Sequence, residues 1–259
     1  MATPARIVPG SRGARWLVEG WRLFRAAPLS WIALAFSYWL LMNLVLLVPV
    51  VGIVAAPVLV PPFSVGFMAA SRAAARGGPV GLEHLFSGFR ERLRGQLVLG
   101  LAFLACLALL LGATTLFDRG ELAHSMLVGP PGGHAGQDDS GTLAAMLVAI
   151  GLYIPVMMMY WFAPVLVAWH GIGAAKALFF SFMACVLNWR AFFAYGAVTI
   201  LMTVVAPSLA ISAVLVAVGG AQAARLEAFV YALFLVMLPT LVASFYVSYR
   251  DIFGTPETA

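Results

Sequence analysis

Long apolar runs alternate with short basic segments along this chain of 259 residues. The runs are rich in Leu, Val, Ala, Ile, Phe and Met, and they contain almost no charged side chains. A helix of about 20 residues is about 30 Å long, which matches the hydrocarbon core of a bilayer. The pattern therefore predicts six transmembrane helices, at about 29–51, 53–70, 96–117, 143–169, 191–218 and 228–247.

Three of the segments between these runs have a helical pattern of their own. Residues 82–94 place apolar side chains at i, i+3, i+4, i+7 and i+11, opposite charged ones. Residues 13–27 group Trp16, Gly20 and Phe24 in the same way. Basic, aromatic, amphipathic helices lie flat in the membrane interface, so we expect both segments there. Residues 174–189 are apolar on most sides, and we expect them to be buried against the spans.

A proline motif recurs in the apolar runs. Ala-Pro-Val-Leu-Val occurs around Pro57 and again around Pro164, and Leu-Pro-Thr-Leu-Val around Pro239 is a looser copy. Each copy lies in the second span after an amphipathic segment, which indicates a threefold repeat of short helix, span and proline-bearing span. Proline bends a helix, so we expect three structural bends around a common centre. The alternative is chance, because proline is frequent in membrane helices.

Composition supports a fold class of all-α membrane protein. The chain is 63% hydrophobic and 10% charged, whereas a soluble domain carries about 25% charged residues. A β-barrel would show alternating strands of about 10 residues, which these runs do not. We therefore expect a single transmembrane domain over residues 1–259, with six transmembrane helices and two or three interfacial helices on the cytoplasmic side.

The distribution of basic residues predicts the orientation. If all six spans cross, one side holds thirteen of the 15 Lys and Arg residues, and the other holds only Arg119 and Arg225. The thirteen are Arg6, Arg12, Arg15, Arg22, Arg25, Arg72, Arg76, Arg90, Arg92, Arg94, Lys176, Arg190 and Arg250. Because short cytoplasmic loops carry the excess of positive charge, both termini should be cytoplasmic in a bacterial inner membrane.

This orientation assigns the remaining segments. Residues 1–28 form a cytoplasmic segment with an interfacial helix, and residues 250–259 form a cytoplasmic tail. The first apolar run is longer than the core of a signal peptide, so we expect a retained span. Residues 118–140 contain Gly-Pro-Pro-Gly-Gly and no apolar periodicity, which predicts a flexible periplasmic loop that packs little.

The sequence shows no constellation typical of an enzyme, a metal site or a cofactor site. All ten Asp and Glu residues lie outside the six predicted spans, which argues against a proton-coupled pump. No histidine has ligand spacing, and a divalent site at His124 and His134 is an alternative we do not favour. Cys106 and Cys185 lie in apolar runs without CxxC spacing, so we interpret them as packing residues.

Arginines beside aromatic residues at the cytoplasmic boundary are the remaining candidates. Guanidinium groups match phosphate geometry, so a lipid-phosphate site is one hypothesis. Its residues are Arg22, Arg25, Arg90, Arg94 and Arg190. The other interpretation is that these arginines only set the topology. The net charge of +5 follows from the orientation bias, so no nucleic-acid partner is expected, and protein partners are unknown.

Four short motifs carry a resemblance when they are taken in order. They are Gly20-Trp21-Arg22-Leu23-Phe24, Leu85-Phe86-x-Gly88-Phe89-Arg90, Trp161-Phe162-Ala163-Pro164 and Asn188-Trp189-x2-Phe192. Together they resemble an uncharacterised family of proteobacterial multi-pass inner-membrane proteins, known mostly by locus-tag names. The layout is also similar to YciC-type proteins and to the membrane domain of some glycerophosphodiesterases. The resemblance implies a fold and a location but no activity.

Two function hypotheses follow. The first is a non-enzymatic inner-membrane protein that binds anionic phospholipid and supports membrane or envelope organisation. The second is a transporter or channel for a small solute. An intramembrane enzyme is a third class, and it lacks any convergent acid, base or nucleophile.

The orientation gives the first testable prediction. A cysteine at Ser125, in the predicted periplasmic loop, should react with an impermeant maleimide on intact cells. A cysteine in the C-terminal tail should react only after permeabilisation. The reverse pattern of labelling would invert the topology.

Overall fold

We describe a computed structural model of the chain, which places residues 5–48, 50–127, 139–209, 211–212 and 223–254. Side chains are described for these residues except 127, 139–140 and 223–235. Every regular element in this part of the chain is a helix, which confirms the all-α expectation.

The helices fall into three groups along the chain. The first group is α1 (Arg12–Ala26), α2 (Pro28–Leu46) and α3 (Val51–Ala75). The second is η1 (Leu82–Phe86), α4 (Ser87–Arg90), α5 (Leu93–Asp118), α6 (Glu121–Leu127), α7 (Asp139–Tyr160) and α8 (Ala163–His170). The third is α9 (Ala174–Leu187), α10 (Trp189–Ile200), η2 (Leu201–Val205) and α12 (Ala223–Phe253).

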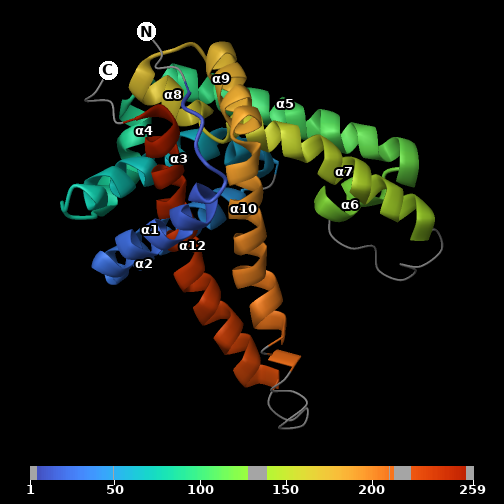
Figure 1. The fold of residues 1–259 in the computed structure, drawn as a ribbon. Coiled ribbons are helices and arrows are strands. Elements are labelled where there is room, and N and C mark those ends of the chain that lie inside the picture. Colours follow the sequence, from blue (N-terminus) through green and yellow to red (C-terminus); the bar gives the residue numbers. More distant parts are fainter. Residues whose placement is uncertain (1–4, 49, 128–138, 210, 213–222, 255–259) are drawn as a thin grey trace.

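The long helices form arms that leave a shared base (Figure 1). Helices α5 and α7 run together in one direction, and α10 and α12 extend in another, while α2 packs on α3. Five segments of the described chain are long and apolar enough to cross a membrane. They are Pro28–Leu46, Val51–Ala75, Leu93–Asp118, Gly141–His170 and Trp189–Leu209. Their exposed Leu, Val, Ile and Phe side chains require lipid around the arms.

The short helices join the arms in a cyclic order. Helix α1 packs on α12 and α10, η1 and α4 pack on α3, and α9 packs on α7 and α8. Each short helix therefore docks on the second long helix of the preceding group, and the first group docks on the last. This arrangement closes a ring of three groups.

Small residues permit this docking. A Cβ atom on Gly20 of α1 would overlap the Thr240 carbonyl oxygen of α12, and one on Gly88 of α4 would overlap the Pro62 carbonyl oxygen of α3. In α9 the corresponding contact is made by Ser181, which lies against the break between α7 and α8. Each short helix thus approaches a neighbouring backbone at a glycine or serine, and α1 does so also at Gly13, against the Ala191 carbonyl oxygen of α10.

Two apolar clusters fill the base. One surrounds the fully buried Trp16 and Phe162 and includes Tyr249 of α12. The other surrounds Trp31 and Leu85. Burying such side chains contributes roughly 1.5–3 kcal/mol each in water, and less where lipid is the alternative environment.

The predicted helix over 82–94 is wrong in detail. The segment is a 3₁₀ turn, a single turn of α-helix and a break, because Arg92 has a left-handed backbone (φ 52°). Periodicity identified the apolar side, since Leu85 is fully buried. Phe89 packs on Phe63 of α3, with ring centroids 4.9 Å apart. The close contact of Gly88 with the backbone of α3 determines the course of the chain in this segment.

The expected apolar face of α1 packs on other helices. The predicted face is buried, but it is buried against α12 and α10. Trp16 lies 5.3 Å from the Phe192 ring, and Gly20 and Phe24 are buried with it. Helix α1 is therefore a packing element of the base.

Part of the predicted flexible loop 118–140 is a helix, α6, over residues 121–127. Asp118 accepts backbone hydrogen bonds from Gly120 (2.9 Å) and Leu122 (2.7 Å), and this capping starts α6. Leu122 is buried against the neighbouring helices. Residues 128–138 lie outside the described part of the chain. The C-terminal tail begins later than expected, because Ile252 and Phe253 are buried at the end of α12.

The three prolines do not have one local geometry, which corrects the expectation of three similar bends. Pro57 and Pro239 lie inside the continuous helices α3 and α12. Pro164 lies instead in the first turn of α8, after a two-residue break. Ser181 supplies hydrogen-bond partners to the backbone at the break. Its hydroxyl accepts a hydrogen bond from the Phe162 N–H (2.9 Å) and donates one to the Met158 carbonyl (2.7 Å).

The docking contact leads to a prediction. Gly20→Ala should force α1 away from α12 and lower the detergent melting temperature by several degrees, which corresponds to about 1–3 kcal/mol. Gly112→Ala is the control, because a Cβ there meets nothing within 4 Å. Differential scanning fluorimetry of both variants measures the difference. Equal melting temperatures would mean that the contact does not constrain α1.

Candidate functional site

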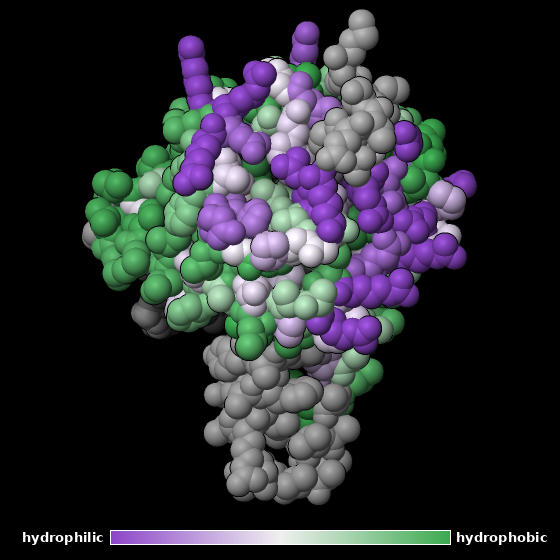
Figure 2. Space-filling model, turned by 90° about the vertical axis from the view of Figure 1, so that its left-hand side faces the viewer, coloured by the Kyte–Doolittle hydropathy of each residue, from purple (hydrophilic) through white to green (hydrophobic). Residues whose placement is uncertain are grey.

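The five candidate arginines lie on short helices or at the starts of long ones. Arg22 and Arg25 are exposed on α1, and Arg90 is exposed on α4. Arg94 and Arg190 are each the second residue of a long helix, α5 and α10. Figure 2 shows hydrophilic side chains gathered over the upper part and one flank of the face in view. The structure does not gather the five arginines into one site.

Arg94 lines a cavity of about 430 Å³ between the start of α5 and the linker from α8 to α9. Arg92 lines it too, and Gly171, Ile172 and Gly173 form the opposite side. Two glycines shape the linker, since Gly171 ends α8 with a positive φ of 66° and Gly173 precedes α9. We call this cavity the α5–α9 pocket.

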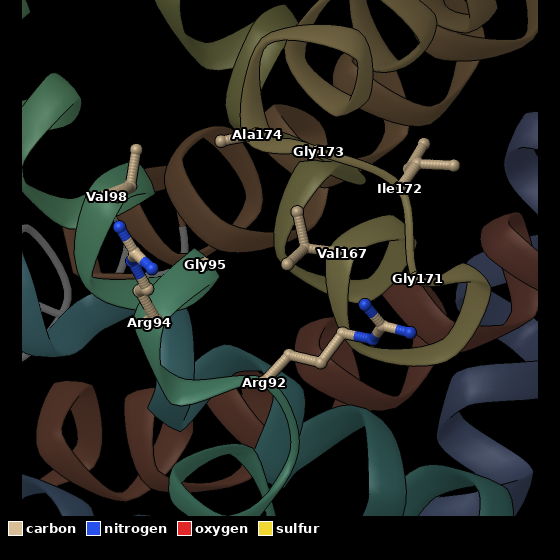
Figure 3. A pocket seen from close by; sticks show the side chains of 9 residues that line it. All are labelled: Arg92, Arg94, Gly95, Val98, Val167, Gly171, Ile172, Gly173 and Ala174. Carbon is tan, nitrogen blue, oxygen red and sulfur yellow. The ribbon is translucent and has the colours of Figure 1, made fainter.

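The charges around the α5–α9 pocket are mostly positive. The N-termini of α5 and α9 both begin at its lining, and neither has a side-chain cap. Uncapped backbone N–H groups and the helix dipole favour an anion there. The Arg92 side chain reaches across toward Gly171, while Arg94 lies along α5 near Val98 (Figure 3). The guanidinium of Arg92 thus approaches the negative end of α8, which leaves Arg94 exposed for a ligand.

The rest of the lining is apolar. Val98 is 47% exposed, and Val167 and Ile172 continue the same wall. A pocket with arginine at its rim and aliphatic side chains below matches a molecule with an anionic head and an apolar body.

Four other charged residues are already paired. Arg12 hydrogen-bonds Asp251, and it lies 3.1 Å from Glu19, which in turn lies 2.6 Å from Arg250. The Trp16 indole also donates to Asp251 (2.9 Å). Burial alone lowers the pKa of Arg12, but the hydrogen bonds and charges of Asp251 and Glu19 raise it overall. This cluster, which ties α1 to the end of α12, was not anticipated from the sequence.

A second unanticipated cluster joins α3, α8 and α12. The Arg72 guanidinium lies over the Trp169 ring, 4.2 Å from its centroid. Trp169 packs edge-on against Tyr249, whose hydroxyl lies 2.7 Å from Nε2 of His170. The cluster links the three proline-bearing helices near their ends on the basic side. The sequence feature that could have indicated this cluster is Trp169-His170-Gly171, two aromatic residues before a glycine that ends a helix.

The other candidate groups have local roles. Nδ1 of His84 lies 3.1 Å from the Gly81 carbonyl, and no three His, Cys, Asp or Glu residues cluster within the described residues. Cys185 is buried, and burial raises the pKa of its thiol to about 12, so it stays protonated and packs like an apolar side chain.

Comparison with known proteins identifies one relative over nearly the whole chain. It is a probable inner membrane protein of Burkholderia thailandensis, 37% identical over 264 residues, and the alignment covers 96% of this chain and 94% of the relative. No protein-family model matches the chain. No solved structure matches it.

The paired cluster yields a prediction about stability. Asp251→Asn removes the charge that holds Arg12 and weakens the bond to Trp16, so unfolding should become easier by about 1–3 kcal/mol. Glu83→Gln is the control, since its side chain is 67% exposed. Thermal unfolding in detergent compares the two variants. An Asp251→Asn protein as stable as the control would contradict a role for this cluster in holding α1.

Proposed function

We propose that this chain, which belongs to the same family as the Burkholderia protein and is a multi-pass protein of the inner membrane, binds anionic phospholipid at its cytoplasmic face. It acts without catalysing a reaction, and it supports the organisation of the membrane around it. The headgroup phosphate contacts Arg94, and the apolar wall of the α5–α9 pocket receives the adjoining part of an acyl chain.

The α5–α9 pocket is the observation that carries this proposal. It combines an exposed arginine, two uncapped helix N-termini and an apolar wall, and each of these suits one part of a phospholipid. Each basic residue near an anionic leaflet contributes about 1 kcal/mol. Arg94, the one left exposed for the ligand, therefore contributes about 1 kcal/mol, a factor of about five in affinity.

The proposal includes six crossings with both termini in the cytoplasm. The two ends of the described chain are joined, since Arg6 donates its backbone N–H to the Ile252 carbonyl (2.8 Å). Ends on one side of a membrane require an even number of crossings. The five apolar spans and α12, which has 31 residues, supply six.

We also propose that the ring of three groups is an internal threefold repeat. The cyclic docking supports it, because the same kind of contact recurs at Gly20, Gly88 and Ser181. The similarity to YciC-type proteins and to glycerophosphodiesterase membrane domains stays a prediction. It would show as the same cyclic docking in their structures.

Replacing both arginines of the pocket tests the function. Arg92→Gln with Arg94→Gln should weaken lipid binding at the α5–α9 pocket at least about fivefold, so that less phosphatidylglycerol co-purifies with the protein in mild detergent. Arg22→Gln with Arg25→Gln removes the same charge from an exposed face of α1 and should change it little. Lipid mass spectrometry gives the amounts. Equal losses from both pairs would show that these arginines attract lipid only through total charge, as topology determinants do.

A further inference from the structure

A second cavity, of about 420 Å³, lies where the N-terminal segment meets the junction of α9 and α10. Residues 7–10 form one side, and residues 187–190 form the other. Asn188 holds the two sides together, because its Oδ1 accepts from the Val8 N–H (2.8 Å) and its Nδ2 donates to the Arg6 carbonyl (3.1 Å). We call this cavity the α10–α1 pocket.

The two pockets occupy the same position in the cyclic order. The α5–α9 pocket lies between the first long helix of the second group and the linker that precedes the short helix of the third. The α10–α1 pocket lies between the first long helix of the third group and the segment that precedes the short helix of the first. The helices that flank them also pack in corresponding pairs, α5 with α9 and α10 with α1.

The residues that line the pockets correspond as well. Arg94 is the second residue of α5, and Arg190 is the second residue of α10. The facing linkers both place an apolar residue before a glycine, Ile172-Gly173 in one and Pro9-Gly10 in the other. Neither α5 nor α10 has a side-chain cap at its N-terminus.

The corresponding long helix of the first group starts with apolar residues. There α2 begins with Pro28 and Leu29, so an apolar side chain stands where the other two helices have arginine. Across from it, Val80 is buried in the cluster around Trp31. The residue at the second position of the helix thus distinguishes two junctions of the ring from the third.

We infer that the α10–α1 pocket is a second binding site for an anionic phospholipid headgroup, so that one chain binds two such lipids. The inference rests on the proposed function and extends it to a separate site. Arg190 contacts the phosphate, and it already lies over the Trp189 ring, 5.5 Å from the ring centroid. Trp189 is 59% exposed, which suits an indole at the headgroup level of a bilayer.

Single substitutions count the sites. The protein is placed in phosphatidylcholine nanodiscs that contain phosphatidylglycerol, and native mass spectrometry of the released protein counts the anionic lipids retained. The wild type should retain up to two. Arg94→Gln and Arg190→Gln should each lower the population that holds two lipids about fivefold, and the double variant should lower it further. Arg15→Gln, an exposed charge on α1 outside both pockets, should retain two.

The outcomes separate this inference from the proposed function. Loss of one lipid with Arg94→Gln and no loss with Arg190→Gln would overturn the second site and leave the first. No loss with either variant, or equal loss with Arg15→Gln, would overturn both. Circular dichroism melting confirms that each variant is folded. A misfolded Arg190→Gln is replaced by Arg190→Lys, which keeps the charge but not the paired geometry and should retain the second lipid less well.

Two further measurements test the place and the source of the ligand. A photoactivatable phosphatidylglycerol should crosslink to the peptide that contains Trp189, and crosslinking to the arms alone would contradict the site. Inorganic phosphate in excess should not displace the lipid, because it lacks the apolar part that the pocket wall contacts. Full displacement would show that the site takes free phosphate rather than a lipid.

Discussion

The close approach of each short helix to a neighbouring backbone is the constraint on which the rest of the structure depends. Gly20 and Gly88 allow it by having no side chain, and Ser181 allows it by replacing hydrogen bonds that the break after α7 leaves open. Because lipid tails are as apolar as leucine, helices in a membrane gain little from hydrophobic contact alone. Backbone proximity and satisfied polar groups therefore hold the three arms at one base.

The ring also explains how the charges are distributed. Its closure brings together the two ends of the chain, and there Arg12, Glu19, Arg250 and Asp251 neutralise one another. Arg72 is held over an aromatic ring within the base. Arg94 and Arg190 remain at junctions between groups, where a linker and a helix start leave a cavity. The basic side of the protein is thus divided into charges that stabilise the fold and charges that line a cavity.

Sequence reasoning was most successful for the long helices, because length and hydropathy are properties of a continuous segment. The expected span at 96–117 corresponds to α5, for example, which runs from Leu93 to Asp118. It failed at 82–94, because periodicity shows which side is apolar but not that Gly88 must fit against Pro62. It also missed the pair of Arg12 and Asp251, which come from opposite ends of the chain. One side of the α5–α9 pocket was predicted from the sequence, because Arg94 was a candidate residue. The linker on the other side could not be predicted, because only the fold brings it close to Arg94.

The starts of the three first long helices differ in the backbone groups that they leave for an acceptor. A helix N-terminus leaves backbone N–H groups without partners, and at a membrane boundary water, a cap or an anion must satisfy them. Helix α2 begins with proline, which has no N–H and is pre-formed for the first turn, so its need for an acceptor is smaller. Helices α5 and α10 begin with Leu93 and Trp189, keep those N–H groups and carry arginine at the second position. A lipid phosphate placed there would accept hydrogen bonds from the backbone N–H groups of the helix start and from the guanidinium together. The groups that start the helix would therefore also select the headgroup.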